Sequence, residues 1–191
     1  MDAITLLKAD HKTVKGLFAK FDKAGDTAFQ TKREIVDKII EELSVHAGIE
    51  ELVFYPAVRG AVPETNDEVL ESLEEHHIVK WLLSELEDMD PKAERFTAKV
   101  TVLKENTLHH AEEEEAELFP IVRKALGRNE LQKIGAQLEA AKRTVPRRPH
   151  PKAPDTPPGN LVATPAAAIA DRARGVLRGR GRSTRPKTRA T

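Results

Sequence analysis

The sequence contains no cysteine. The chain therefore forms no disulfide framework and offers no thiolate to a metal, so any metal site must use nitrogen and oxygen ligands. Aromatic residues are also scarce, at 4% of 191 residues, whereas charged residues make up 32%. Together with long stretches of Glu, Lys, Leu and Ala, this composition favours helices. The length suits one domain with an extension.

Long hydrophobic runs are missing as well. No run approaches the roughly 18 apolar residues of a membrane-spanning helix. The first residues lack the basic region and apolar core of a secretory signal. We therefore expect no membrane span and a cytoplasmic location.

A net charge of zero conceals an uneven distribution along the chain. Residues 144–191 hold 11 Lys and Arg against two acidic residues, a charge of +9, which leaves −9 for residues 1–143. An acidic body thus carries a basic tail. The tail is either a solubilising extension, a segment that packs against the acidic body, or a contact for DNA or another polyanion.

Seven histidines are present, and four of them belong to an internal repeat. Segments 46–56 and 110–120 each open with His, carry Glu at the fifth position and close on Pro. A spacing of four places an imidazole and a carboxylate on one helix face, where both can reach a single ion. These residues are His46, Glu50 and Pro56 in the first segment, and His110, Glu114 and Pro120 in the second.

The repeat extends further towards the N-terminus. His11 and His76 each follow an acidic residue and are each followed by Val, Lys and Leu at the third, fourth and sixth positions. This alignment selects His76 over His77, and the offsets to Glu and Pro select His110 over its neighbour. Residues 1 to about 126 thus consist of two copies of a helical hairpin, each with one lone His and one His-x-x-x-Glu. Asp10 and Glu75, which precede the lone histidines, are candidates for orienting a metal-bound imidazole.

Hydrophobic periodicity predicts four long helices in this region. We expect Pro56 to kink the second helix or end its regular part, Asp90-Pro91 to start the fourth, and Gly127 to stop it. The turns lie midway between the paired histidines, so the six candidate ligands converge at one level of an antiparallel, up-down-up-down four-helix bundle. The predicted helices span about 3–23, 31–59, 66–86 and 91–125.

These boundaries predict one all-α domain followed by extensions. The bundle covers residues 1–128, and a short fifth helix is possible over residues 129–143. Residues 144–165 hold seven prolines and read as an extended, disordered linker. Residues 166–191 read as a basic, largely disordered tail, with room for a short helix near 166–177.

Four imidazoles and two carboxylates without sulfur suit iron, manganese or zinc. A structural zinc would need four ligands and one ion, whereas six ligands from two similar halves indicate an under-coordinated dinuclear centre. One Glu from each half can bridge the ions and offset their repulsion. Tyr55, Phe54 and Phe119 are candidates for the pocket wall, while His77 and His109 are expected outside the ligand set.

The order of these motifs over residues 2–125 resembles the hemerythrin-like, HHE cation-binding domain. The resemblance implies a four-helix bundle around two iron ions with a bridging oxide or hydroxide. It further implies terminal histidine ligands and bridging glutamates, here His11, His46, His76, His110, Glu50 and Glu114. The oxygen-carrying members have a His where this chain has Lys80, and an Asp one residue further along as the last carboxylate.

That departure argues against reversible oxygen carriage. The first hypothesis is a di-iron protein that binds, senses or reacts with oxygen, peroxide or nitric oxide. The alternative is an enzyme that decomposes peroxide or reduces nitric oxide at the same site. A third hypothesis, ranked last, is a structural bundle whose histidines bind no metal.

Overall fold

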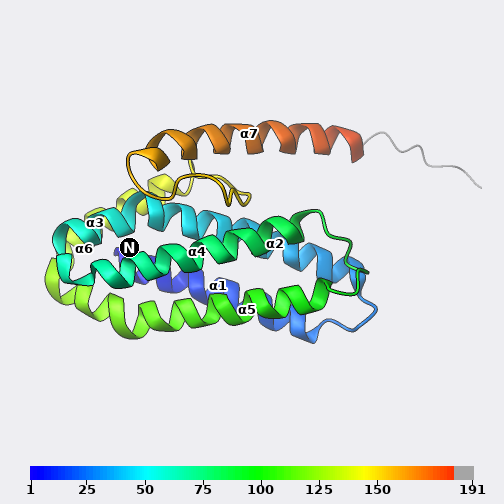
Figure 1. Cartoon of the computed structure of the whole chain (residues 1–191), viewed down its shortest axis with the longest axis horizontal. Coiled ribbons are helices and arrows are strands. Elements are labelled where there is room, and N and C mark those ends of the chain that lie inside the picture. Colours follow the sequence, from blue (N-terminus) through cyan, green and yellow to red (C-terminus); the bar gives the residue numbers. More distant parts are fainter. Residues whose placement is uncertain (183–191) are drawn as a thin grey trace, which may run out of the picture.

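The computed structural model of the chain describes residues 1–182, and every regular element in that range is helical. Figure 1 shows α1, α2, α4 and α5 lying lengthwise beside one another, with α7 along the outside. Contacts join α1 to α2, α2 to α4, α4 to α5 and α5 to α1. Among the described residues, no helix has the length and hydrophobicity needed to cross a lipid bilayer. The elements are α1 (Ala3–Lys23), α2 (Phe29–Ile49), η1 (Glu50–Phe54), α3 (Tyr55–Ala61), η2 (Pro63–Thr65), α4 (Asn66–Glu87), α5 (Phe96–Glu113), η3 (Glu114–Leu118), α6 (Phe119–Ala141) and α7 (Gly159–Arg182).

The first helix shows how local chemistry sets an element's limits. The side chain of Asp2 accepts a hydrogen bond from the backbone N–H of Thr5 at 2.9 Å and so caps the helix start. Lys20 and Lys23 lie in the last turn, where positive charge interacts favourably with the helix dipole. The observed range, Ala3–Lys23, matches the prediction.

Two π-helical segments, η1 and η3, interrupt the second and fourth predicted helices at equivalent places. Each begins at the Glu of a His-x-x-x-Glu motif and ends two residues before a proline, Pro56 or Pro120. Proline lacks the N–H that continues an α-helical ladder. The backbone N–H of Tyr55 instead bonds to the carbonyl of Glu50, and that of Phe119 to the carbonyl of Glu114. The regular part of the second helix thus ends at Ile49, seven residues before Pro56.

Two predicted boundaries have different outcomes. Asp90-Pro91 does not start the fourth helix, because α5 begins at Phe96. The side chain of Asp90 accepts a hydrogen bond from the N–H of Lys92 at 2.8 Å, which closes a turn instead. At Gly127 the backbone does leave helical geometry, with φ of 67°, a conformation that favours glycine. A helical stretch follows and ends at Ala141.

The C-terminal part differs from the expected disordered linker. Residues 142–158 form turns and irregular backbone, and Val145 among them is buried in the core. Helix α7 begins at Gly159 and contains Pro165. It therefore starts within residues 144–165, the region predicted to be extended. Asn160, which is 1% exposed, donates a hydrogen bond to the carbonyl of Glu51 and anchors this end. The predicted tail residues 183–191 lie outside the described range.

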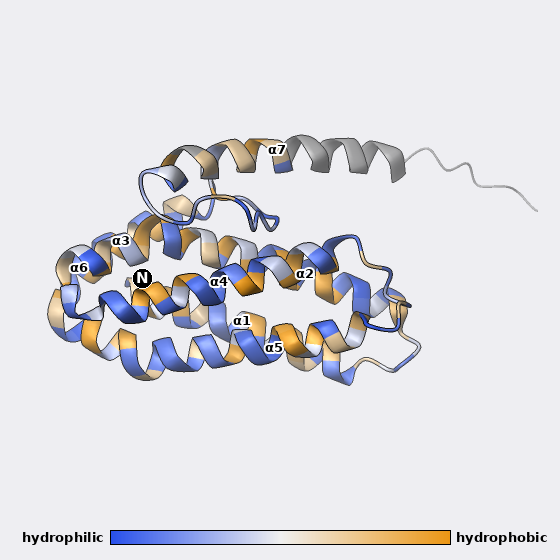
Figure 2. Ribbon diagram, viewed as in Figure 1, coloured by the Kyte–Doolittle hydropathy of each residue, from blue (hydrophilic) through white to orange (hydrophobic). Residues whose placement is uncertain are grey.

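The core consists of two apolar clusters with polar residues between them. Figure 2 shows polar residues on the outer faces of the long helices and apolar residues between them. Along α1, Leu7 belongs to one cluster and Val14 to the other, and His11 lies between. The same order holds along α4, where His76 stands between Leu73 and Val79.

Candidate metal centre

All six predicted ligands meet in the layer between the two apolar clusters. Each is between 0% and 9% exposed, and α1, α2, α4 and α5 each contribute one imidazole. The two glutamates come from the first position of η1 and of η3, where the wider π-helical turn begins. Such turns are often found at functional sites. The residues are His11, His46, Glu50, His76, His110 and Glu114.

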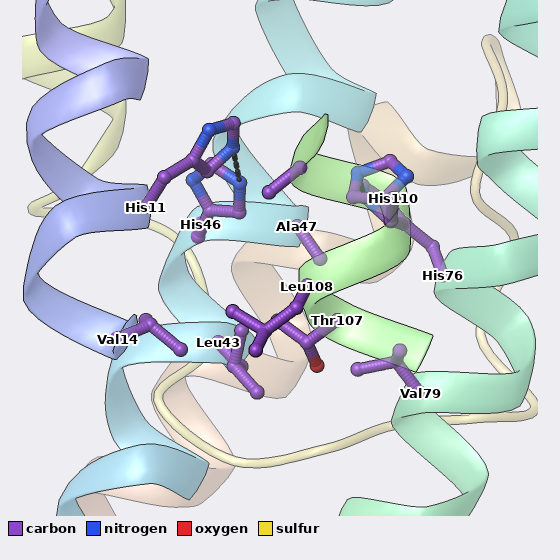
Figure 3. A pocket seen from close by; sticks show the side chains of 11 residues that line it. His11, Val14, Leu43, His46, Ala47, His76, Val79, Thr107, Leu108 and His110 are labelled. Carbon is purple, nitrogen blue, oxygen red and sulfur yellow. Dashed lines mark hydrogen bonds between the residues drawn. The ribbon is translucent and has the colours of Figure 1, made fainter. Parts of the chain in front are cut away.

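The imidazoles form two pairs, one from each half of the repeat. The Nε2 atoms of His11 and His46 lie 3.1 Å apart, and those of His76 and His110 lie 3.2 Å apart. In Figure 3 His11 and His46 lie on one side of the site, and His76 and His110 lie on the other. Two Nε2 atoms this close can share one cation, so each half presents its own bidentate nitrogen site.

Each glutamate lies between the two imidazole pairs. Oε2 of Glu50 is 3.2 Å from Nε2 of His46 and 3.4 Å from Nε2 of His76. Oε2 of Glu114 is 3.4 Å from Nε2 of His11 and 3.7 Å from Nε2 of His110. Both carboxylates therefore reach a histidine of each half, which is the position a bridging ligand requires.

Two overlapping groups of side chains could hold a metal ion. One comprises His11, His46, Glu50 and Glu114, and the other comprises Glu50, His76 and His110. Glu50 belongs to both, so ions in the two groups would share its carboxylate. Neither oxygen of Glu50 has a hydrogen-bond partner among the described residues, although the residue is fully buried. A buried carboxylate without a partner is costly, and a bound cation would remove that cost.

The electrostatics of the protein atoms alone also favour a cation. Burial, and then the charge of Glu114, raise the pKa of Glu50 well above its usual value. Burial lowers the pKa of His46 and, with the neighbouring His110, holds that of His76 well below normal. Neutral imidazoles are the form that binds metal. His46 and His76 are thus held in the metal-binding form, whereas at His110 burial is outweighed by the charges of Glu114 and Glu75, which raise its pKa.

A second layer of carboxylates contacts the other ring nitrogens. Nδ1 of His110 lies 2.7 Å from Glu75, and Nδ1 of His46 lies 3.7 Å from Asp10. The two carboxylates proposed from sequence thus face the second His of their own half, not the adjacent one. A carboxylate at this nitrogen fixes the tautomer and orientation of a metal-bound imidazole.

The remaining two carboxylates of this layer were missed in the sequence. Glu51 lies 3.0 Å from Nδ1 of His76, and Glu115 lies 3.0 Å from Nδ1 of His11. Glu51 follows Glu50 in the first half but contacts a histidine of the second half. Glu115 follows Glu114 in the second half but contacts a histidine of the first. The signal available in the sequence was the Glu-Glu pair that opens both η1 and η3. In the structure, the second Glu of each pair has its histidine partner in the opposite half.

The region around Lys80 distinguishes the two halves. Lys80 lies 2.7 Å from Oε1 of Glu51. The equivalent carboxylate Glu115 is paired instead with a more exposed lysine, Lys8, at 3.3 Å. Burial, opposed by Lys80, raises the pKa of Glu51. The carboxylate that contacts His76 is therefore more buried than the one that contacts His11.

The aromatic residues at equivalent repeat positions also differ. The hydroxyl of Tyr55 donates a hydrogen bond to Oε1 of Glu114 at 3.0 Å and lies 3.4 Å from Nε2 of His76. Its counterpart Phe119 stacks beside the ring of His11, with centroids 6.0 Å apart. Burial, with the charge of Glu114, raises the pKa of Tyr55 well above normal, so the phenol keeps its proton.

The other histidines lie away from this cluster. His77 is exposed, and His150 pairs with Asp171 at 3.1 Å. His109 is exposed and lies 3.2 Å from Glu113. Glu75, His109 and Glu113 form a third, more exposed group of possible metal ligands, separate from the six buried residues.

A small cavity lies against the four imidazoles. Its volume is about 20 Å³, enough for about one water-sized molecule. Figure 3 shows side chains from α1, α2, α4 and α5 around it. Apart from the histidines its lining is mainly apolar: Val14, Leu43, Ala47, Val79, Thr107, Leu108 and Ala111.

Fold and site together define an all-helical protein with a buried His/Glu site suited to cations. The family described as hemerythrin HHE cation binding domain matches residues 2–122. The chain belongs to this family.

Individual relatives agree with this assignment. An uncharacterised hemerythrin-like protein of Schizosaccharomyces pombe is 29% identical over 88% of this chain and 82% of its own. A crystal structure of a hemerythrin HHE cation binding domain-containing protein from Mycobacterium kansasii is similar in fold, with a TM-score of 0.64 and 25% identity. That similarity covers 75% of this chain and 86% of the other. A DNA nickase of Nostoc sp. strain PCC 7120 is 28% identical over 78% of this chain but 41% of its own length.

Proposed function

We propose that the chain is a non-haem di-iron protein that binds, senses or reacts with oxygen, peroxide or nitric oxide. In this proposal α1, α2, α4 and α5, with η1 and η3, form an antiparallel four-helix bundle around two irons bridged by oxide or hydroxide. The bound irons would supply electrons to the small molecule. The observation that carries the proposal is the sharing of Glu50 between two ligand groups.

The protein residues would divide the work at such a centre. Each imidazole pair would hold one ion, and Glu50 and Glu114 would hold the two together. The carboxylates at Nδ1 would keep the imidazoles in the metal-binding tautomer. Six ligands leave positions open, and the cavity of about 20 Å³ against the four imidazoles favours small ligands over large ones.

Metal content and the visible absorption spectrum test this proposal directly. We expect about two irons per chain after anaerobic reconstitution, with absorption bands of an oxo-bridged ferric pair. His110→Ala should lose these bands, while His77→Ala, which changes an exposed neighbour, should keep them. Absence of iron from the reconstituted wild-type protein would contradict the proposal and leave another metal or no metal.

The enzymatic alternative is favoured by one observation, the buried hydroxyl of Tyr55. It lies between Glu114 and His76 and keeps its proton at neutral pH. It therefore remains a hydrogen-bond donor inside the site, which would stabilise negative charge that develops during decomposition of peroxide or reduction of nitric oxide. Stopped-flow mixing separates the two functions: several turnovers per iron pair favour the enzyme, and one spectral change without turnover favours the sensor.

The basic tail supports a separate proposal of contact with DNA or another polyanion. Its charge of +9 is one argument, and the relative named as a DNA nickase is another. Arg147 and Arg148, however, pair with Glu41 and Glu87 of the helical body, as expected of a tail that packs against it. Replacing Arg178, Arg180 and Arg182 with Gln should lower the affinity for duplex DNA and make that affinity less dependent on salt concentration. Unchanged affinity would contradict this proposal.

A further inference from the structure

Among the described residues, Thr107 and Ser44 carry buried hydroxyls without a hydrogen-bond partner, and of the two it is Thr107 that lines the cavity beside the imidazoles. Thr13, Ser72 and Thr101 each donate a hydrogen bond to the carbonyl four residues earlier, at 2.9 to 3.1 Å. The hydroxyl of Thr107 makes no hydrogen bond among the described residues, although Thr107 is only 8% exposed. A buried polar group without a partner destabilises a protein, so this hydroxyl calls for an explanation.

The position of Thr107 supplies one. It lies on α5 one turn before His110 and lines the cavity of about 20 Å³ together with the four imidazoles. A molecule in this cavity therefore lies beside Thr107. Apart from the histidines, the hydroxyl of Thr107 is the polar side-chain group of the lining.

The side chain can turn its hydroxyl towards such a molecule. In Figure 3 the oxygen of Thr107 is directed away from the imidazoles. Threonine in a helix populates two χ1 rotamers, and changing between them moves the hydroxyl to another position around the Cα–Cβ bond. Because the observed rotamer gains no hydrogen bond, a ligand that offers one would select the other rotamer.

We propose that the hydroxyl of Thr107 hydrogen-bonds to the outer atom of a small anionic or peroxidic ligand held at the open metal positions. This inference rests on the proposed function and makes Thr107 a determinant of which small molecules bind. A ligand with an acceptor on its outer atom, such as azide or hydroperoxide, gains this bond. Thr107 then acts through the bound molecule and not as a metal ligand.

Azide is a suitable probe, with three variants of similar volume or chemistry. Thr107→Val keeps the shape and removes the hydroxyl, Thr107→Ser keeps the hydroxyl, and Thr101→Val removes a hydroxyl of the same helix that already has a partner. Titration of the iron-loaded proteins should show about tenfold weaker azide binding in Thr107→Val, the loss of one hydrogen bond. The azide stretching frequency should shift in that variant and be restored in Thr107→Ser.

The metal-free protein provides a second readout. Thr107→Val removes an unpartnered hydroxyl, so its melting temperature should rise by about 2 to 4 °C. A lower melting temperature would mean that the hydroxyl already has a partner and would overturn the assignment. So would normal iron content with unchanged azide affinity and frequency in Thr107→Val. A wild-type protein without iron would instead overturn the proposed function itself.

Discussion

Oε1 of Glu115 lies 3.0 Å from Nδ1 of His11, although 104 positions separate the two residues. The equivalent contact of the other half joins Glu51 to His76 at the same distance. In both cases the carboxylate directly follows a glutamate of one half and contacts the lone histidine of the other. The arrangement thus has a two-fold character that follows the sequence repeat.

Glu115 offers a clean test of this second layer because its loss leaves no buried charge. We expect Glu115→Gln to weaken metal binding about tenfold or more, since His11 loses the carboxylate that sets its tautomer. The stability of the metal-free protein should hardly change, because Glu115 and Lys8 are both partly exposed. Competition with a coloured chelator measures the affinity. Glu112→Gln, an exposed change in the same acidic run, is the control, and equal affinities of both variants would exclude this role.

Glu50 should affect stability and binding in opposite directions. Its carboxylate is fully buried, unpartnered and close to Glu114. Glu50→Gln should therefore stabilise the metal-free protein, by about 1 to 3 kcal/mol, while it removes a shared ligand and reduces the bound metal. Urea unfolding in the presence of a chelator measures the first effect. A destabilised metal-free variant would show that Glu50 has a favourable role in folding.

We expect Asp2, which caps the start of α1, to make a pH-dependent contribution to the free energy of unfolding. Partial burial opposes ionisation of Asp2, but hydrogen bonds from Thr5 and Arg123 outweigh it and hold its pKa below the usual value. A lowered folded pKa gives stability above the unfolded pKa of about 4, lost as pH falls through the folded value. Asp2→Ala should thus cost about 1 kcal/mol at pH 7, and less below about pH 4. Unfolding of both proteins across this pH range tests it, and a constant difference would contradict the assignment.

Gly135 and Gly16 should respond oppositely to alanine. A Cβ at Gly135 would lie 2.3 Å from the carbonyl oxygen of Met1 and 3.0 Å from the N atom of Ala3, so Gly135→Ala must displace the start of α1. We expect it to cost about 1 to 3 kcal/mol. Gly16 is exposed within α1 with open space around it, and Gly16→Ala should stabilise by about 0.5 to 1 kcal/mol. Thermal unfolding compares the two, and similar shifts would mean that the contact at Gly135 relaxes freely.

Periodicity and spacing predicted the helices and the six clustered residues, because both depend on positions along single helices. The partners of Nδ1 at His11 and His76 could not be predicted in this way, because they come from the opposite half. The π-helical turns also escaped prediction: proline signals a lost hydrogen bond but not how the preceding turn adjusts. The unpartnered hydroxyl of Thr107 is visible only once its surroundings are known.

The C-terminal segment was mispredicted for a related reason. Its prolines indicate an irregular backbone, and residues 142–158 are irregular. The contacts that hold it in place are tertiary. Asp171 accepts hydrogen bonds from the backbone N–H groups of Arg147 and Arg148, and Asn160 bonds to the carbonyl of Glu51. Single buried polar side chains of this kind leave no periodic signal in a sequence.

The crossed contacts of Glu51 and Glu115 bear on how such a centre could arise. A single hairpin can pair its second histidine with its own acid, Asp10 or Glu75, but its lone histidine finds a carboxylate only on another hairpin. Two identical hairpins would satisfy this need reciprocally, as the subunits of a two-fold symmetric dimer do. In the present chain the two halves make these contacts reciprocally, and a difference between them, such as Tyr55 at the position equivalent to Phe119, is one that a single chain allows and a symmetric dimer forbids.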